Sequence, residues 1–437
     1  MSFEGKLTSA RYALTHDGLS VQFAAMTDTQ AFARQLYSFL RQNQRWLGGC
    51  FLLTVFSSFG QTFFISQFSK QIRSTFELSD GDFGLLYMAA TLASAITLVW
   101  LGKIVDRIPV AKVSMAITVC LAIACCIMSL AGSIVALFLA LYGLRLFGQG
   151  MMTHTSQTAI GKWYSADRGR AISLTTMGHQ FGEALFPSLV LVAVGMFGWQ
   201  VTWQIAAGIL SVIALPAISM LLKVEREPVP LSMGVVSDVK VRDWSRSEVM
   251  QDLAFWGLLL SVLAPAFIGT SVFFHQDHLI EAKGWKEGTF AAAYIVLAAA
   301  TISSTLVGGW LVDKYSAKSL LVFFLLPMGV GCFILGSSDS PSAIFAFMAL
   351  LGGSYGLSSA LFGTIWPETY GTKNLGSVRA VAVAAMVFAS ALGPGITGWC
   401  IDHEITFSRQ LLAMGSYCVM ASMFMIVVSR MLSNRDK

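Results

Sequence analysis

Charged side chains are scarce in this chain of 437 residues: Asp, Glu, Lys and Arg make up 12% of it, about half the share in a typical soluble domain. Hydrophobic residues supply 55%, and the mean hydropathy is +0.67. So little charge excludes a soluble globular enzyme and a disordered chain, because both need a solvated polar surface. The composition indicates a polytopic membrane protein.

Other absences narrow the function. The seven cysteines lie inside or at the ends of apolar runs, with no ligand-like pair flanked by His, so we interpret them as small buried hydrophobes. Gly161-Lys162 is followed by Trp163, so the chain has no Walker-type phosphate loop, which argues against an ATP-driven pump. No nucleophile–base constellation indicates an enzyme. We expect no cofactor, no metal and no nucleic-acid partner.

Apolar runs dominate what is present. A membrane-spanning helix needs roughly 20 mostly apolar residues, and twelve such runs follow one another with one long polar interruption. We therefore predict an arm at 1–46, a six-helix bundle at 47–223, a linker at 224–252 and a second bundle at 253–433. The predicted spans are 47–68, 83–104, 111–131, 134–158, 170–196, 200–222, 253–275, 289–311, 319–336, 342–365, 378–400 and 410–430.

The distribution of Lys and Arg predicts the orientation. With both termini inside, cytoplasmic segments and helix ends hold 23 of the 29 basic residues. The outer loops then hold only five, and the opposite orientation would invert the ratio. We expect a multi-pass protein of the cell (inner) membrane, a monomer in the lipid bilayer, with the arm and the linker in the cytoplasm.

The two halves repeat one another. Leu101-Gly-Lys-Ile-Val-Asp-Arg107 recurs as Gly308-Gly-Trp-Leu-Val-Asp-Lys314, so that Gly102 and Asp106 match Gly309 and Asp313 at a separation of 207 residues. Ala184-Leu-Phe-Pro187 recurs as Ala391-Leu-Gly-Pro394, also at 207, and Gly60 matches Gly269 at 209. A six-helix unit duplicated in the same orientation is an all-α membrane fold of two parallel repeats.

These residues resemble a known family. Gly102-Lys-Ile-Val-Asp-Arg107, followed by Lys112, looks like the loop 2–3 signature of the major facilitator superfamily, and Gly309 to Lys318 is its degenerate copy. Trp366-Pro-Glu-Thr-Tyr-Gly-Thr-Lys-Asn-Leu-Gly376 resembles the loop before helix 11 in oxalate–formate and monocarboxylate porters. The resemblance implies alternating access between two bundles, with Gly102, Asp106, Arg107 and Asp313 as gating residues on the cytoplasmic side.

Two ionisable carboxylate or basic residues lie deep within the predicted spans, Arg145 in helix 4 and Glu183 in helix 5. A central charge costs roughly 3 kcal/mol on insertion scales, so each needs a partner or a water-filled cavity. They differ in depth by about one helical turn. One hypothesis is a structural ion pair between the two helices. The other is a central site in which Arg145 binds an anionic substrate and Glu183 takes up a proton.

Neighbouring residues extend the predicted site. Gln149 lies four residues after Arg145, and His179 lies four before Glu183, so each pair shares a helix face. We assign Gln149 to substrate binding and His179 to proton handling. Uncharged hydrogen-bonding groups next to Gly60 and Gly269 are expected to line the cavity, and the residue that matches Ser66 in the repeat is expected to gate its outer mouth. These residues are Gln61, Thr270 and Ser271 for the lining, and His275 for the gate.

One departure from the branch leaves the substrate open. Oxalate–formate and monocarboxylate porters typically carry an arginine in helix 8, but residues 289–311 contain no charge. We expect a secondary active carrier, a symporter of a small organic anion resembling a monocarboxylate, driven by a proton or counter-ion gradient. The alternative is a proton-coupled exporter of amphipathic compounds, which the aromatic content of 12% favours.

Overall fold

The computed structural model describes residues 37–164, 168–226, 242–371 and 374–435. Contacts divide the chain into two units, Met1–Gly48 and Gly49–Lys437. In the first unit, the described residues 37–48 are helical, and the side-chain amide of Asn43 donates to the carbonyl of Phe39 at 2.8 Å. The predicted arm at 1–46 therefore lies mostly outside the described residues.

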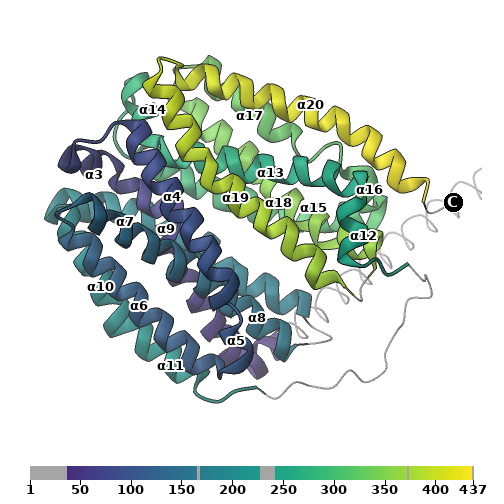
Figure 1. Cartoon of the computed structure of the whole chain (residues 1–437), viewed down its shortest axis with the longest axis horizontal. Helices are drawn as coiled ribbons and strands as arrows, with labels where there is room; N and C mark the ends of the chain where they lie inside the picture. The colour runs from purple at the N-terminus through teal and green to yellow at the C-terminus, as the bar shows by residue number, and fades with distance from the viewer. Residues whose placement is uncertain (1–36, 165–167, 227–241, 372–373, 436–437) are drawn as a thin grey trace, which may run out of the picture. The chain divides into compact units, whose positions relative to one another are not determined.

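The second unit carries the membrane fold (Figure 1). Its first half opens with helical residues 49–56 and runs to the linker. Its elements are η1 (Ser57–Gly60), α2 (Thr62–Ile65), η2 (Ser66–Phe68), α3 (Ser69–Phe76), α4 (Asp80–Leu101), α5 (Ile104–Arg107), α6 (Val110–Leu130), α7 (Ile134–Gly143), η3 (Leu144–Met152), α8 (Thr153–Trp163), α9 (Arg168–Phe197), α10 (Trp199–Ile209), η4 (Leu210–Ala214) and α11 (Leu215–Leu222).

The second half starts after the linker. Its elements are α12 (Arg246–Gln251), α13 (Leu253–Phe274), α14 (Gln276–Lys283), α15 (Thr289–Tyr315), α16 (Ala317–Leu320), α17 (Leu326–Ser337), α18 (Ser342–Tyr370), α19 (Leu375–Asp402) and α20 (Phe407–Ser433). The end of this unit at which α11 stops and α13 begins is called the linker end. The end where α4 begins and α19 stops is the far end.

Ten helices among the described residues are long and apolar enough to cross a membrane, or eleven if one bent pair counts as a single span. Their outward surfaces are apolar: Leu130, Val212, Leu253 and Leu306 are each more than 70% exposed. Such side chains suit lipid and not water. The protein is therefore a multi-pass membrane protein, and the span count is compatible with the twelve predicted.

Two of the predicted spans are not continuous helices. The helix that ends at Gly60 and the helix Thr62–Phe76 meet at a bend of 46°, with Gln61 extended between them. The run 319–336 is also divided, because α16 ends at Leu320 and the 12-residue α17 starts only at Leu326. Gly60 and Pro327 explain the breaks: glycine adds backbone freedom, and proline favours the first turn of a new helix.

Side-chain caps set several helix starts. Ser79 accepts from the backbone of Asp82 at the start of α4, and the carboxylate of Asp82 accepts from the backbone of Ser79. Ser245 and Glu248 form the same reciprocal box at α12. These exchanges satisfy amides that have no partner within the helix.

The linker end of the second half is fixed by Asp252, the N-cap of α13. Its carboxylate accepts two hydrogen bonds from Arg435, at 2.6 and 2.8 Å, and one from the hydroxyl of Tyr370 at 2.8 Å. Burial alone would raise the pKa of Asp252, but these hydrogen bonds outweigh it and hold the pKa below its ordinary value. The cluster joins the start of α13 to the end of α20.

The predicted repeat has a direct signature in the far-end contacts. The side-chain amide of Gln67 donates to that of Gln276, 209 residues later, and the backbone of Lys70 donates to Asp277, 207 residues later. Gln276 also donates to Ser66, at a separation of 210. Equivalent positions of two repeats touch where a two-fold axis relates them. The halves therefore meet around a pseudo-two-fold axis at this end.

The halves close on each other at the far end. Helices α4 and α19 run side by side (Figure 1), and α9 packs against α15. A methyl group on Gly84 would lie 2.4 Å from the carbonyl of Pro394, and one on Gly398 would lie 2.5 Å from that of Asp80. Toward the linker end the same helices are more exposed: Trp100 on α4 and Val383 on α19 are 70% and 55% exposed. The two-fold packing thus seals one end of the unit.

Candidate functional site

Arg145 lies in η3, a π-helical segment of nine residues within the fourth span. Such wide turns are rare and often occur at functional sites. Gln149 is in the same segment and is half-buried. Because a π-helix turns less per residue than an α-helix, the predicted shared face of Arg145 and Gln149 is only approximate.

The break in the first span meets this segment. A methyl group added to Gly60 would lie 2.0 Å from the carbonyl of Leu144 and 2.8 Å from the Cα atom of Gly148. Gly148 faces Gly60 in the same way, with an added methyl 2.7 Å from its Cα atom. Two glycines thus bring backbone against backbone, as small residues do in membrane helix crossings. The crossing presents the carbonyl of Gly60 to Arg145.

The guanidinium of Arg145 is 1% exposed. One terminal nitrogen donates to the Gly60 carbonyl at 3.2 Å and to the hydroxyl of Thr62 at 3.3 Å. The charge lies 5.2 Å from the ring centroid of Tyr87, whose hydroxyl contacts Thr62 at 2.9 Å. Its Nε and its other terminal nitrogen have no hydrogen-bond partner among the described residues. A buried cation with unused donors can accept an anion.

Glu183 and His179 lie on α9, which docks on the first span through glycines. Methyl groups on Gly178 and Gly182 would come within 2.3 Å of Thr54 Oγ1 and 2.1 Å of Ser58 Oγ. This pair of glycines therefore lets the two helices approach closely. His179 packs its ring edge-on to Phe63, with centroids 5.6 Å apart.

Glu183 is 5% exposed. Within the described part of the chain no ion pair joins it to Arg145, whose donors go to Gly60 and Thr62 instead. Tyr294 and Tyr355, on α15 and α18 of the other half, lie near Glu183. Both side chains are therefore buried in their spans, but the described residues show no ion pair between them.

The predicted lining residues divide into two groups. Gln61 is 8% exposed and lies at the break beside Arg145. The hydroxyls of Thr270 and Ser271, by contrast, donate to backbone carbonyls of their own helix α13. Thr270 also contacts the carbonyl of Ser390 at 3.1 Å, which Pro394 leaves without its usual helical donor. The hydroxyl of Thr270 therefore joins α13 to α19, whereas that of Ser271 bonds only within α13.

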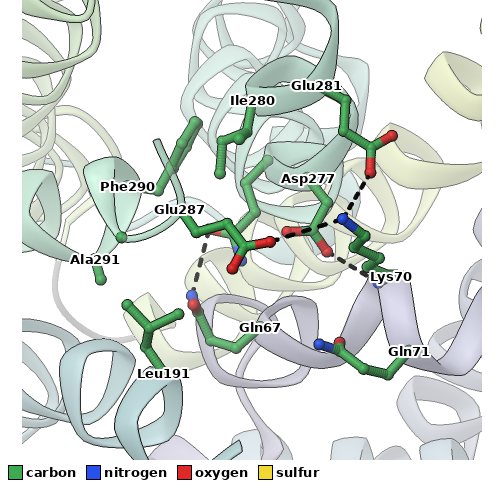
Figure 2. Close-up of a pocket in the computed structure, with 12 residues that line it drawn as sticks. Gln67, Lys70, Gln71, Leu191, Asp277, Ile280, Glu281, Glu287, Phe290 and Ala291 are labelled. Carbon is green, nitrogen blue, oxygen red and sulfur yellow. Dashed lines mark hydrogen bonds and ion pairs between the residues drawn. The ribbon is translucent and has the colours of Figure 1, made fainter. Parts of the chain in front are cut away.

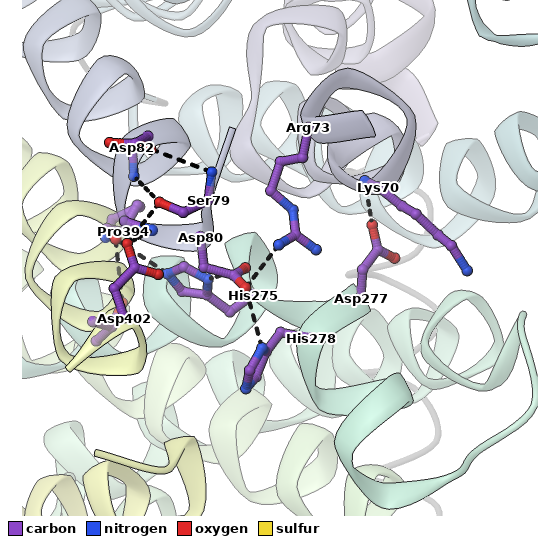
Figure 3. A network of polar contacts seen from close by, with 12 residues as sticks. Lys70, Arg73, Ser79, Asp80, Asp82, His275, Asp277, His278, Pro394 and Asp402 are labelled. Atoms are coloured by element: carbon purple, nitrogen blue, oxygen red, sulfur yellow. Dashed lines mark hydrogen bonds and ion pairs between the residues drawn. The ribbon is translucent and has the colours of Figure 1, made fainter. Parts of the chain in front are cut away.

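His275 lies where we expected a gate, at the end of α13. It is 2% exposed, and its Nε2 lies 3.1 Å from the carbonyl of Pro394 on α19. Its Nδ1 lies 3.5 Å from the carboxylate of Asp80, the first residue of α4. His275 thus joins the two halves at the far end (Figure 3).

The gating residues predicted at the linker end are only partly described. Gly102 ends α4, and its carbonyl contacts Nε2 of His154 at 3.2 Å. Arg107 ends α5 and is exposed. The side chains of Asp106 and Asp313 lie outside the described part of the structure.

Several residues around these sites were not singled out from the sequence. Tyr87 beneath Arg145, Tyr294 near Glu183, and Asp80 with Arg73 and His278 at the far end all belong to this group. The box Ser79-x-x-Asp82 marks the start of α4 and is the one sequence signal that draws attention to Asp80. An aromatic residue in an apolar run carries no such signal.

An all-helical membrane unit of two repeats, closed at one end around buried charges, defines a transporter. The profile of the Major Facilitator Superfamily matches residues 50–394. The chain belongs to this superfamily, and it is a transporter and not an enzyme.

Relatives and solved structures agree with this assignment. The chain is 22% identical over 381 residues to a hexuronate transporter of Bacillus subtilis, covering 81% of this chain and 87% of that protein. It is 22% identical over 299 residues to the oxalate:formate antiporter of Oxalobacter formigenes, covering 65% and 69%. A bacterial homologue of the human lysosomal transporter Spinster, solved inward-facing and unoccupied, has a TM-score of 0.68 at 18% identity, covering 90% of this chain and 98% of that one.

Proposed function

We propose that this protein is a secondary active transporter that carries a small organic anion together with a proton across the inner membrane. The observation that carries the proposal is the guanidinium of Arg145, buried to 1% exposure with two nitrogens that have no partner among the described residues. Two relatives whose names specify anionic substrates, hexuronate and oxalate with formate, support an anion as the cargo.

Arg145 suits a carboxylate because two of its nitrogens can donate to one anion. The anion reaches it through a movement of the break at Gly60 and Gln61, since both residues are buried in this conformation. Gln61 and Gln149 then supply uncharged hydrogen bonds near the anion. A mobile backbone at a broken helix beside a buried charge is a common arrangement in transporter binding sites.

Glu183 is assigned to the proton. An ionised carboxylate at this depth needs a counter-charge or water, and no counter-ion faces it among the described residues. It therefore carries a proton whenever the site is dry. His179, one turn away on α9, is the group through which the proton reaches it.

The charge distribution of the loops supports an orientation with the far end outside and the linker end in the cytoplasm. In this orientation the structure is closed to the outside. Closure then alternates between His275 at the far end and Gly102, Asp106, Arg107 and Asp313 at the linker end. The substrate and the proton gradient are the partners of a monomer in the bilayer.

An exporter of amphipathic compounds is the second candidate, and an aromatic cluster supports it. Phe63 lies 6.0 Å from Tyr294 between ring centroids, and Phe273 lies 5.2 Å from the same tyrosine. These rings bring α2, α13 and α15 together near Glu183. Aromatic surfaces of this kind bind apolar cations and amphipathic molecules.

Proteoliposomes test the proposal. With an imposed pH gradient, we expect accumulation of a labelled monocarboxylate, dicarboxylate or uronate. Arg145→Ala should reduce uptake by about 10- to 100-fold, the range for losing hydrogen bonds to a charge. Arg430→Ala, at an exposed arginine of α20, is the control.

Glu183→Gln should keep anion exchange and lose pH-driven accumulation. Unchanged anion uptake in Arg145→Ala would refute the site, and dye extrusion without anion flux would favour the exporter.

A further inference from the structure

A cluster of charged groups joins the halves at the far end (Figure 3). Its centre is Asp80, at the start of α4. One carboxylate oxygen contacts Arg73 at 2.7 Å and Nδ1 of His278 at 3.2 Å, and the other lies 3.5 Å from Nδ1 of His275. Arg73 and Asp80 belong to the first half and the two histidines to the second. The side chains of Asp80 and His275 are 14% and 1% exposed, so water screens their interaction weakly.

The two ring nitrogens of His275 both face acceptors. Nε2 lies 3.1 Å from the carbonyl of Pro394, which can only accept, so this nitrogen carries a hydrogen. Nδ1 faces the carboxylate of Asp80, which also accepts when it is ionised. A neutral histidine has only one N–H. With that hydrogen on Nε2, the lone pair of Nδ1 would point at the carboxylate of Asp80, and the two would repel.

The contact therefore needs one additional proton, carried on Nδ1 of His275 or on the facing oxygen of Asp80. His278 has no such requirement. Its Nδ1 has one acceptor, Asp80, and a neutral ring with the hydrogen on that nitrogen satisfies the contact. Of the two histidines that face Asp80, His275 is therefore the one whose contact needs an extra proton.

The surroundings of His275 supply no competing charge within the described residues. Phe274 and Phe407 pack on its ring, with centroids 5.1 and 5.7 Å away, from α13 and α20. On α19, the carboxylate of Asp402 is engaged by the hydroxyl of Ser79 at 2.6 Å and the backbone of Gly81 at 3.0 Å. Arg73 and His278 are the remaining charged or titratable neighbours, and both contact Asp80.

We propose that a proton held between His275 and Asp80 locks the two halves together at the far end, so that binding this proton and closing this end are one event. When the proton leaves, the lone pair of Nδ1 faces a carboxylate and the contact becomes repulsive. Closure is weakened because the attraction between His275 and Asp80 across the halves is lost.

A second contact nearby acts in the same direction. Lys70 points between Glu281 and Glu287, with Nζ at 3.3 and 3.7 Å from their carboxylates, while its backbone donates to Asp277 (Figure 2). Burial raises the pKa of Asp277 to about 6, against the smaller effect of the Lys70 hydrogen bond. A raised pKa means that closure at this contact is favoured at low pH and weakens as pH rises through about 6.

The inference deepens the proposed function and rests on it only in placing the far end outside. There, an acidic exterior would close the outer gate as it supplies the coupling proton. The proton at His275 is separate from the one assigned to Glu183.

Spin labels on the full-length protein in lipid nanodiscs measure the lock without substrate. Thr75→Cys and Lys286→Cys place exposed labels on either half at the far end. The cysteines that are not buried, Cys120, Cys126 and Cys400, are first replaced by Ala. Between about pH 5.5 and about pH 8.5, a range that spans histidine titration, we expect the short distance to give way to a longer one. The closed-to-open ratio should fall by up to about tenfold per pH unit for each linked proton.

Variants separate the lock from other titrations. His275→Gln keeps a donor for Pro394 but cannot hold the proton. The closed-to-open ratio should therefore depend on pH with one linked proton fewer than in the wild type. Asp80→Asn places an amide donor against the neutral Nδ1, so the far end should open less than in the wild type as pH rises, with only the Asp277 contact left to titrate. His403→Gln, at an exposed histidine of the same end, should behave like the wild type. The lock is refuted if distances do not change with pH, if His275→Gln retains the wild-type profile, or if Asp80→Asn opens as the wild type does.

The same variants distinguish this inference from the proposed function. A pH-dependent distance with no proton-driven anion uptake leaves the lock standing and removes the proposed cargo or coupling. Proton-driven uptake with pH-independent distances does the reverse.

Discussion

Replacing Gly60 by Ala tests the backbone crossing that holds Arg145. Gly60 has an ordinary negative φ, so alanine is allowed by its conformation, and any effect comes from contact. The added methyl would lie 2.0 Å from the carbonyl of Leu144, whereas ordinary contact begins at 3.4 Å. The two helical segments must therefore separate by about 1.4 Å.

The expected cost has two parts. Inserting a methyl group into a well-packed interior destabilises by about 1–3 kcal/mol. The separation also stretches the hydrogen bond from Arg145 to Gly60, now 3.2 Å, beyond bonding distance. A hydrogen bond to a charged group contributes about 1.5–3 kcal/mol. Together, these two effects should lower the free energy of unfolding by about 2.5–6 kcal/mol.

Thermal unfolding in detergent measures this change with a thiol-reactive dye, because Cys50, Cys125, Cys332 and Cys418 are buried and react only when the fold opens. Gly208→Ala in α10 is the matched control, since nothing lies within 4 Å of its added methyl. It should unfold at or slightly above the wild-type temperature. If the unfolding temperature of Gly60→Ala equals that of the control, the close packing of Gly60 against η3 does not constrain the protein as argued.

The same unfolding assay tests two further contacts. Thr270→Val should cost about 1 kcal/mol by removing the donor to the Ser390 carbonyl. In a Pro394→Ala background this loss should nearly vanish, because residue 394 then supplies its own N–H; equal losses in both backgrounds would contradict the assignment. Arg435→Gln should lower the unfolding temperature above about pH 4, where the depressed pKa of Asp252 stabilises the fold. The difference should shrink as pH falls through that depressed value, and a difference independent of pH would exclude the ion pair as its source.

Much of the architecture follows from the sequence because two long-range patterns specify it. The lengths of the apolar runs predict the membrane spans. The offset between Gly102 and Gly309 predicts the repeat, and in the structure the equivalent residues Gln67 and Gln276 of the two repeats are in contact. The division of the run 319–336 at Pro327 was not predicted. A glycine such as Gly60 is compatible with a packed helix or a broken one, and only the crossing with Gly148 decides between them.

The charged residues of the site could be predicted from the sequence, but the residues that contact them could not. Arg145 and Glu183 are conspicuous because charges are rare in apolar runs. Their contacts depend on helix rotation, and the π-helical turns of η3 alter that rotation locally with no pattern that announces it. His275 was found because it replaces Ser66 in the repeat. Asp80 was missed because an acidic residue at a helix start has an ordinary explanation as a favourable charge near the helix dipole.

The pseudo-two-fold axis has a consequence for how such a chain can arise. In a symmetric dimer of identical halves, each residue on the axis faces its own copy. Gln67 and Gln276 keep this arrangement, but the side chain of Lys70 lies 3.3 Å from a different residue of the other half, Glu281. By the same offset of 209 residues, the first half has Ile72 where the second half has Glu281. An exact duplicate would therefore lack this ion pair, so the divergence of the two halves in charge adds a link that closes this end.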